Sequence, residues 1–310
     1  MAPYSLPPDA VWFITGCSTG IGNELVSYLT TNTSSRVVAT ARNPSSLSSL
    51  PTTPNTLKLA LDVTSESSIR AALTATLQKW SRIDVLVNNA GYGLLADTEG
   101  VPMSQAHSIM ETNFFGAALL TQLTLPIFRD NNPTSGQQGG VVLQVTSMGG
   151  RLAFPGNAFY HASKFALEGF TEAVSKEMPE EWNIHFCCIE PGGVKTNYIS
   201  TSTAQGGEVP HPAYTDPKLP TNQIRVYKSS PEATRNWAEA GDVVRAMYEI
   251  VRNGAGSEGE IPLRLPLGSD SWGMQKLGLE KGLRDLEDVK GVSLKTSGKE
   301  QLESIRFLKV

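Results

Sequence analysis

Short, continuously apolar segments alternate with longer amphipathic segments along this chain, and that alternation limits the possible folds more than any other feature. Six segments are expected to be strands: Val11–Thr15, Arg36–Thr40, Thr56–Leu61, Asp84–Asn88, Val141–Thr146 and Ile184–Ile189. Four are expected to be helices: Ile21–Leu29, Ser65–Trp80, His107–Phe128 and Ala158–Met178. Strands that are apolar throughout are typical of a parallel sheet that helices cover on both faces. The sequence therefore predicts the α/β class, with one doubly wound parallel sheet in a single domain.

Several segments fall outside this pattern. Residues 11–270 are expected to be one domain, preceded by an N-terminal extension at residues 1–10. Residues 198–236 are rich in Pro, Ser, Thr and Gly and too long for an ordinary connection, so we expect a functional lid or a disordered segment. The polar residues 129–140 are expected to be an exposed loop. Residues 271–310 are expected to form a charged, solvated helical tail.

The composition excludes several classes of function. Hydrophobic residues make up 40% of the chain and charged residues 18%, which is too apolar for a disordered protein. A net charge of −4 gives no basic surface for nucleic acid, and no apolar run is long enough for a secretory signal or a membrane span. Three cysteines, two of them adjacent, make no disulfide framework, so a reducing, cytoplasmic setting is expected. The four histidines are scattered, and no metal site is expected.

Three glycines follow the first predicted strand, at positions 16, 20 and 22 of the segment TGCSTGIG. Gly16 permits a tight turn, Gly20 lets the backbone approach a pyrophosphate, and Gly22 allows the helix to pack closely. The N-terminus of the next helix offers N–H donors and the positive end of its dipole to phosphate groups. This segment therefore predicts the dinucleotide-binding turn of a Rossmann-type sheet.

The same segment contains a second motif of a different class. Residues 16–20 match G-x-S-x-G, the nucleophile elbow of α/β-hydrolases, with Ser18 as the nucleophile. Its position argues against this alternative, because only one strand precedes Ser18 whereas the hydrolase elbow follows several. Labelling of Ser18 by a fluorophosphonate probe would support the hydrolase.

The end of the second predicted strand bears on the choice of dinucleotide. An acidic residue there would accept hydrogen bonds from the adenosine ribose and favour NAD(H). The sequence has Arg42 instead, whose planar guanidinium suits a 2′-phosphate, so NADP(H) is preferred over NAD(H). Asp62, after the third strand, offers a carboxylate that could contact the adenine amino group.

Tyr160 and Lys164 stand four residues apart on a predicted helix, so their side chains share one face. Such pairs arise readily by chance. Ser147 follows a predicted buried strand and projects from the carboxyl edge of the sheet, where open α/β sheets bind ligands. Because all three residues are expected at this edge, a shared functional site becomes more plausible than a chance pair.

With these motifs in order, the chain resembles the short-chain dehydrogenase/reductase family, and most closely its hydroxysteroid- and retinol-dehydrogenase-like branch. The resemblance covers residues 11–196, and more weakly residues up to about 270. The matching positions are Thr15–Gly22, Asp62-Val63, Asn88–Gly91, Asn113, Ser147, Tyr160, Lys164 and Pro191–Thr196.

The resemblance implies a role for each matching residue. Tyr160 would be the general acid in reduction and the general base in oxidation, Lys164 would favour its phenolate, and Ser147 would donate to the substrate oxygen. Asn113 would hold a water that links Lys164 to solvent. The residues implied to line the cofactor site are Gly16, Ser18, Thr19, Gly20, Ile21, Gly22, Arg42, Asp62, Val63, Asn88, Asn89, Ala90, Gly91, Tyr160, Lys164, Pro191, Gly192, Val194 and Thr196.

Two functions of different class remain open at this point. The first is an NADP(H)-dependent oxidoreductase that interconverts a ketone or aldehyde and an alcohol on a largely apolar small molecule. Met148, Phe154, Pro155 and Tyr198 would border that substrate. The second is a dinucleotide-binding scaffold with a regulatory, non-redox role, which would bind NADPH without turnover. The family resemblance also implies homodimers or homotetramers, formed through the helices at 107–128 and 158–178.

Overall fold

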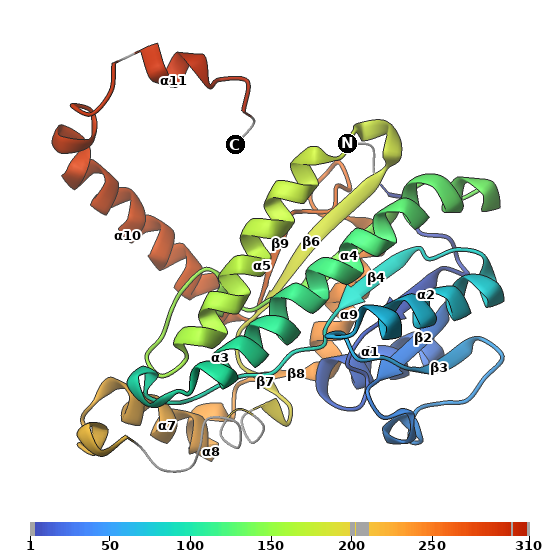
Figure 1. The fold of residues 1–310 in the computed structure, drawn as a ribbon, viewed down its shortest axis with the longest axis horizontal. Helices are drawn as coiled ribbons and strands as arrows, with labels where there is room; N and C mark the ends of the chain where they lie inside the picture. Colours follow the sequence, from blue (N-terminus) through green and yellow to red (C-terminus); the bar gives the residue numbers. More distant parts are fainter. Residues whose placement is uncertain (1–3, 199–201, 203–210, 299, 309–310) are drawn as a thin grey trace.

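A computed structural model describes residues 4–198, Ser202, 211–298 and 300–308. Its main sheet has seven parallel strands in the order β3-β2-β1-β4-β5-β6-β9 (Figure 1). The strands are β1 (Val11–Ile14), β2 (Arg36–Ala41), β3 (Thr56–Ala60), β4 (Val85–Asn88), β5 (Gly140–Val145), β6 (Ile184–Pro191) and β9 (Arg264–Leu267). This order is that of a doubly wound sheet, which confirms the predicted fold class.

Helices cover both faces of the sheet. On one face lie α1 (Gly20–Asn32) and α9 (Ala240–Asn253), and on the other α2 (Glu66–Trp80), α4 (Gly116–Pro126) and α5 (Ala158–Glu177). Because successive side chains of a strand point to opposite faces, Trp12 packs into the first layer and Phe13 into the second, each fully buried. Both faces of β1 therefore need apolar residues, which explains why its sequence does not alternate.

The helix α2 follows its sequence signals closely. The Ser65 hydroxyl accepts a hydrogen bond from the Ser68 N–H at 3.4 Å and caps the helix. Ile69, Ala72 and Leu73 are buried on the face that meets the sheet. The expected cap and the expected apolar face are both confirmed.

The long helix predicted at His107–Phe128 begins earlier and contains two wide turns. It consists of α3 (Met103–Met110), a π-helical segment η3 (Glu111–Phe115), α4, and a second π-helical segment η4 (Ile127–Asn131). A π-turn inserts one extra residue into the helical ladder and is frequent at functional sites. The first one contains Asn113, which is 1% exposed.

The prediction of an exposed loop at residues 129–140 is confirmed for the exposure of much of the segment and wrong about its irregular structure and about Asn132. The segment continues as η4 and a 3₁₀ turn, η5 (Asn132–Ser135), and Asn132 is fully buried. The Asn132 amide nitrogen donates to the carbonyls of Ile83 and Gly139, and its oxygen accepts from the Ile83 N–H. One side chain thus satisfies the backbone groups where β4 and β5 begin, which is why this asparagine is buried while its polar neighbours stay exposed.

The lid prediction falls partly on residues 199–201 and 203–210, which lie outside the described residues. The described remainder is helical, with η8 (Pro212–Tyr214), α7 (Pro220–Ser229) and α8 (Pro231–Thr234). Two short parallel strands, β7 (Val194–Lys195) and β8 (Ala238–Glu239), frame this segment. The described second half of the segment is therefore helical, which contradicts the alternative of a disordered segment.

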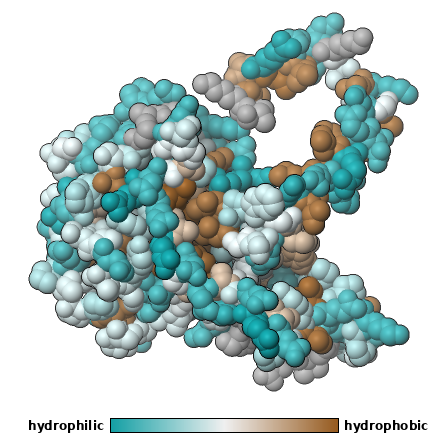
Figure 2. All heavy atoms as spheres, turned by 180° about the vertical axis from the view of Figure 1, so that it is seen from behind, coloured by the Kyte–Doolittle hydropathy of each residue, from teal (hydrophilic) through white to brown (hydrophobic). Residues whose placement is uncertain are grey.

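The C-terminal helix α10 (Ser269–Ser293) leaves the body of the molecule and leads to the short α11 (Glu300–Ser304) (Figure 1). Figure 2 shows hydrophobic side chains along this arm. Leu279, Leu283 and Leu286 are each more than 60% exposed. In the described part of the chain, every helix is too short or too polar to cross a membrane.

Candidate active site

A cavity of about 950 Å³ lies at the carboxyl edge of the sheet. It runs from the end of β2, at Arg42, past the glycine turn to Tyr160 and the helix α7. All the residues predicted for the catalytic, cofactor and substrate sites line it except Gly22, Asn88, Asn113 and Pro155. Motifs that are up to 180 residues apart in the sequence therefore meet in one space.

The glycine turn has the backbone conformation that its sequence predicts. Gly16 and Gly20 have φ values of +69° and +61°, in the left-handed region that favours glycine. A Cβ at Gly16 would lie 2.9 Å from the Ala90 Cα, and one at Gly22 would lie 2.5 Å from the Gly16 carbonyl oxygen. Gly22 is therefore needed for packing beneath the turn and not for contact with a ligand.

The N-terminus of α1 is open toward the cavity. Thr19 occupies the N-cap without a side-chain capping bond, and the first turn of the helix contains no acidic residue. Its N–H groups and the positive end of its dipole thus lack a protein anion, so these residues fit a pyrophosphate.

The turn is fixed to the neighbouring strand β4 by Thr15 and Asn89. The Thr15 hydroxyl accepts from the N–H groups of Asn89 and Ala90, both at 2.9 Å. The Asn89 amide nitrogen donates to the carbonyls of Thr15 at 2.8 Å and Gly16 at 3.1 Å. These bonds hold the turn rigid before any ligand binds.

The placement of Asn88 at the adenosine side is wrong. Asn88 is buried, and its amide donates to the Ala117 carbonyl at 3.3 Å and to the Thr121 hydroxyl at 3.0 Å. Because alternate residues of a strand face opposite sides, Asn88 fastens α4 to the sheet while Asn89 faces the turn.

Arg42 is exposed at the far end of the cavity. Within the described part of the chain no carboxylate pairs with its guanidinium, and its charge lowers the pKa of Tyr92 against the larger opposing effect of burial. One oxygen of Asp62 accepts from the Thr64 N–H at 2.9 Å and from the Thr64 hydroxyl at 2.8 Å. Asp62 therefore shapes the turn after β3 as well as lining the cavity.

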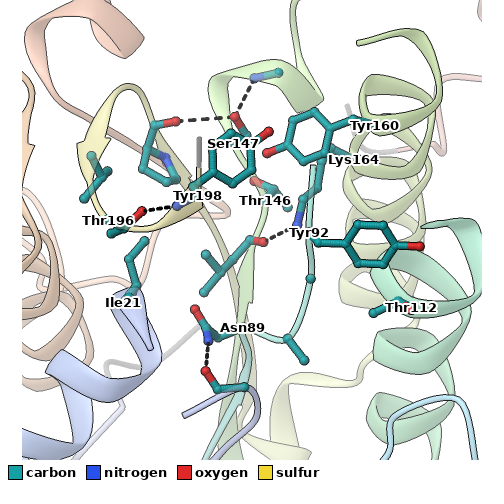
Figure 3. A pocket seen from close by; sticks show the side chains of 18 of the residues that line it. Ile21, Asn89, Tyr92, Thr112, Thr146, Ser147, Tyr160, Lys164, Thr196 and Tyr198 are labelled. Atoms are coloured by element: carbon teal, nitrogen blue, oxygen red, sulfur yellow. Dashed lines mark hydrogen bonds between the residues drawn. The ribbon is translucent and has the colours of Figure 1, made fainter. Parts of the chain in front are cut away.

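Ser147, Tyr160 and Lys164 meet at the other end, as Figure 3 shows. The Ser147 hydroxyl oxygen accepts from the Gly149 N–H at 3.0 Å and lies 3.5 Å from the Pro191 carbonyl. The Lys164 Nζ donates to the Val145 carbonyl at 2.8 Å and lies 5.9 Å from the centre of the Tyr160 ring. β5, the turn after it and α5 together bring the three residues together.

At this end of the cavity, burial and the neighbouring polar groups shift the pKa values of Tyr160 and Lys164 in opposite directions. Burial raises the pKa of Tyr160, while hydrogen bonds with Ser147 and Tyr198 lower it. Burial lowers the pKa of Lys164 to about 8, and the nearby Glu168 carboxylate acts in the opposite direction. The two hydroxyl groups therefore oppose the effect of burial on the Tyr160 pKa.

Asn113 lies behind the cavity wall. Its amide oxygen accepts from the Tyr92 N–H at 3.0 Å, and its nitrogen donates to the Tyr92 carbonyl at 2.9 Å and to the Ser163 hydroxyl at 3.1 Å. The side chain therefore clasps the Tyr92 backbone, beside Gly91 and Lys164. The sequence motif locates Asn113, but it does not predict the π-turn that turns the residue inward.

Of the predicted substrate residues, Tyr198 contacts Tyr160. Its ring centre is 5.7 Å from that of Tyr160 (Figure 3). Burial and the neighbouring Tyr160 both raise the pKa of Tyr198. Met148 and Phe154 line the same end of the cavity, as expected for an apolar ligand.

Sequence reasoning missed several residues that line the substrate end. They are Asn157, His161, Ile224, Tyr227, Lys228 and Trp237. The indole of Trp237 packs against Gly193, where a Cβ would lie 2.5 Å from the ring. The one available signal was the proximity of Asn157 and His161 to Tyr160 in the sequence, because α7 and Trp237 arrive only through folding of the lid.

The loop after β6 is held from the C-terminal helix. Asp270, in the first turn of α10, accepts from the Gly193 N–H at 2.7 Å and from the Ser271 N–H at 2.9 Å. The Thr196 side chain, in the same loop, lies close to Gly20: a Cβ placed on Gly20 would be 3.7 Å from it. The loop therefore closes over the glycine turn.

Comparison with known proteins identifies the family. A model of the short chain dehydrogenase family matches residues 10–206. The chain belongs to this family. Proteins of this family bind a nicotinamide cofactor, and the glycine turn and the cavity beside it fit such a group.

Relatives of this dehydrogenase cover most of its length. It is 43% identical over 296 residues to the oxidoreductase calM of Penicillium decumbens, covering 94% of each chain. It is 36% identical over 250 residues to retinol dehydrogenase 8 of Homo sapiens, covering 77% of this chain and 76% of that one. A crystal structure of a short-chain dehydrogenase from Streptomyces avermitilis superposes with a TM-score of 0.75 at 28% identity, covering 93% of this chain and 98% of that one.

The geometry of this dehydrogenase also bears on the hydrolase alternative. Ser18 lies on the exposed part of the glycine turn, and in the described residues no histidine hydrogen bonds to it. His161 is bonded instead to the Gly149 carbonyl, and His185 to the Asn183 side chain. Ser18 therefore lacks the base that a serine nucleophile requires. The described residues also hold no cluster of metal-binding side chains.

Proposed function

We propose that the protein is an NADP(H)-dependent oxidoreductase that interconverts a ketone or aldehyde and an alcohol on a largely apolar substrate, with Tyr160 as the general acid and base. The observation that carries this proposal is a single cavity with the glycine turn and Arg42 at one end and Tyr160, Ser147 and Lys164 at the other. The bound dinucleotide would supply or accept the hydride. Proton transfer and orientation are left to the protein.

The protein's part follows from the contacts of the three residues. In reduction, Tyr160 gives its proton to the oxygen that was the substrate carbonyl. The Ser147 oxygen accepts from the Gly149 N–H, and its O–H donates to the Pro191 carbonyl over a long 3.5 Å. Exchange of that long bond for one to the substrate oxygen would stabilise the charge that develops there. Lys164, held by the Val145 carbonyl, favours the phenolate that Tyr160 becomes.

NADP(H) is preferred over NAD(H) on the strength of Arg42. Its exposed guanidinium lies at the cavity end that follows β2, and within the described residues it has no carboxylate partner. A 2′-phosphate would accept two parallel hydrogen bonds from such a group, whereas a ribose hydroxyl gains little from it.

The substrate is inferred to be largely apolar. Met148, Phe154 and Ile224 line that end of the cavity, together with the rings of Tyr198 and Trp237. Retinol dehydrogenase 8, which is 36% identical, is named for an alcohol of this kind. The lid helices would close over the bound molecule and exclude water.

We also infer that the protein forms homo-oligomers through η3, α4 and α5. Phe115 and Phe165 are 51% and 45% exposed on this side, and Phe114, Phe115 and Phe170 border a shallow apolar hollow. Burial of such a surface against a second copy removes apolar area from water. Light scattering should show a dimer or tetramer, and Phe115→Glu should shift it toward monomer. A monomeric native chain contradicts the inference.

The function is tested by oxidation of NADPH and NADH over a panel of ketones and aldehydes. The native chain should reduce at least one class of apolar ketone with NADPH. Tyr160→Phe should lower kcat by about 10²–10⁴-fold, because it removes general acid catalysis while keeping the ring. NADPH binding, followed by fluorescence, should change little. Full activity in Tyr160→Phe would exclude the mechanism, and NADPH binding without turnover of any carbonyl compound would support a scaffold.

A further inference from the structure

Lys228 places an amine at the substrate end of the cavity. It belongs to the lid helix α7, is half-buried, and donates from Nζ to the Asn157 side-chain oxygen at 3.3 Å. The same Nζ lies 5.7 Å from the centre of the Tyr198 ring. Both neighbours are uncharged. In the described part of the chain no carboxylate pairs with Lys228, and burial is the only influence that shifts its pKa.

The neighbouring arginine of the same helix shows the usual arrangement. The Arg225 guanidinium lies 3.2 Å from the Asp97 carboxylate, which is buried. Lys228, three residues later, turns instead into the cavity. A partly buried cation without a counter-ion carries a desolvation cost that a bound anion would offset.

The groups around Lys228 leave its positive charge uncompensated. Burial lowers the pKa of Lys228 to about 8, so it is mostly protonated at neutral pH. His161 faces it from α5, and burial lowers the pKa of His161 and keeps that ring neutral. The Tyr198 ring faces Lys228 from the segment after β7, and the raised pKa of Tyr198 keeps its hydroxyl uncharged.

The Asn157 side-chain oxygen bonds to Lys228 and not to the N-terminus of its own helix. It occupies the N-cap of α5, where an asparagine oxygen ordinarily accepts from a first-turn N–H. Here it makes no capping bond, and its oxygen accepts from Lys228 instead. The positive end of the α5 dipole therefore lies close to the ammonium group and adds to the attraction for an anion.

We propose that Lys228, held by Asn157, forms a subsite for an anionic oxygen of the substrate, such as a carboxylate or an ionised phenol. Both residues border the Tyr198 ring, whose centre lies 5.7 Å from the Lys228 Nζ and 5.7 Å from the Tyr160 ring centre. One substrate molecule lying along the Tyr198 ring could therefore place an anionic oxygen at Lys228 and its carbonyl at Tyr160. This inference rests on the proposed function, which makes the substrate a ketone or aldehyde that reacts at Tyr160. It narrows that substrate to an apolar molecule with an acidic group at one end.

Binding tests the subsite without turnover. Biphenyl-4-carboxylate, its methyl ester and a nitrophenolate are titrated by calorimetry at pH 7.5, with and without saturating NADPH. The native chain should bind the carboxylate at least about tenfold more tightly than the ester, since a charge-assisted bond contributes about 1.5 kcal/mol or more. The nitrophenolate arm tells whether a phenolate is accepted as well.

Variants assign the preference to Lys228. Lys228→Met keeps the length of the side chain and should abolish the discrimination between acid and ester, while Lys228→Arg should keep most of it. Lys218→Met, at an exposed position outside the cavity, is the matched control and should behave like the native chain. Equal affinity for acid and ester in the native chain, or an undiminished preference in Lys228→Met, overturns the proposal.

Kinetics separates failure of the subsite from failure of the proposed function. With an acetylated aryl carboxylate and its methyl ester as substrates, Lys228→Met should raise the KM of the acid at least about tenfold, with kcat nearly unchanged and the ester unaffected. If Tyr160→Phe abolishes reduction of both but Lys228→Met treats both as the native chain does, only the subsite is wrong. If no ketone is reduced by the native chain, the proposed function fails and the binding experiment alone decides the subsite.

Discussion

The two ends of the cavity are built in different ways. The cofactor end comes from consecutive strand–turn–helix units, and its backbone is fixed by local bonds such as those of Thr15 and Asn89. The substrate end is assembled from the turn after β5, the start of α5, the segment after β7 and the lid helix α7. The cofactor end is thus formed mainly by backbone, as a cradle around the glycine turn, and the substrate end mainly by side chains. Substitutions should therefore act through backbone strain at the first and through single contacts at the second.

The largest effect is expected at the cradle, from Gly16→Val. The backbone there has φ +69°, and a side chain would meet the Ala90 backbone. Strain of this kind costs about 1–2 kcal/mol before the clash is counted, so NADPH affinity should fall by about 100-fold and Tm should drop. Fluorescence titration and thermal unfolding measure the two quantities.

Gly169→Ala is the matched control for that variant. Gly169 lies in α5 with open space where its Cβ would be, and alanine favours a helix. Its Tm should stay level or rise. Normal NADPH binding by Gly16→Val would show that the turn is not the rigid element described here.

A smaller effect is expected for Arg42→Leu, which removes one side chain and leaves the cradle intact. Hydrogen bonds to charged groups contribute about 1.5–3 kcal/mol, so the Kd for NADPH should rise by about 10- to 100-fold. The Kd for NADH should stay within about twofold and provides the internal control. A parallel loss of both dinucleotides would assign Arg42 a structural role instead.

The smallest effect is expected for Tyr198→Phe at the substrate end. The hydrogen bond with Tyr198 lowers the pKa of Tyr160, so its removal raises that pKa. Alcohol oxidation needs the phenolate, and the rising limb of its pH–rate profile should move to higher pH. One hydrogen bond contributes about 0.5–1.5 kcal/mol, so the rate near neutral pH should fall by roughly two- to tenfold. A shift toward lower pH would contradict the assigned bond.

The same contrast explains how far the sequence alone could go. The glycine turn, the apolar strands and the Tyr160–Lys164 spacing are local patterns, and each predicts its structure because the contacts it needs are close by in the chain. The strand β9 was missed because it is short and contains Pro266, which the edge of a sheet tolerates.

Residues that act through distant partners could not be predicted in this way. Asn132 looks like part of a polar loop until Ile83 is brought beside it, and the inward turn of Asn113 depends on a π-turn that no local signal marks. Lys228 lies in a segment whose composition suggested only a lid, 71 residues from the Asn157 that holds it. In each case the deciding contact is long-range.

The C-terminal helix α10 has two parts, one bonded to the body of the molecule and one that extends away from it. Its first three turns are attached to the body, through Asp270 on the Gly193 N–H, Gln275 on Glu190 and Gly278 against Leu152, and the later turns extend away as an arm. A shift of the start of α10 would move the Asp270 carboxylate and with it the Gly193 N–H that it holds. The position of the C-terminal helix and the shape of the loop beside the glycine turn are therefore joined through a single carboxylate.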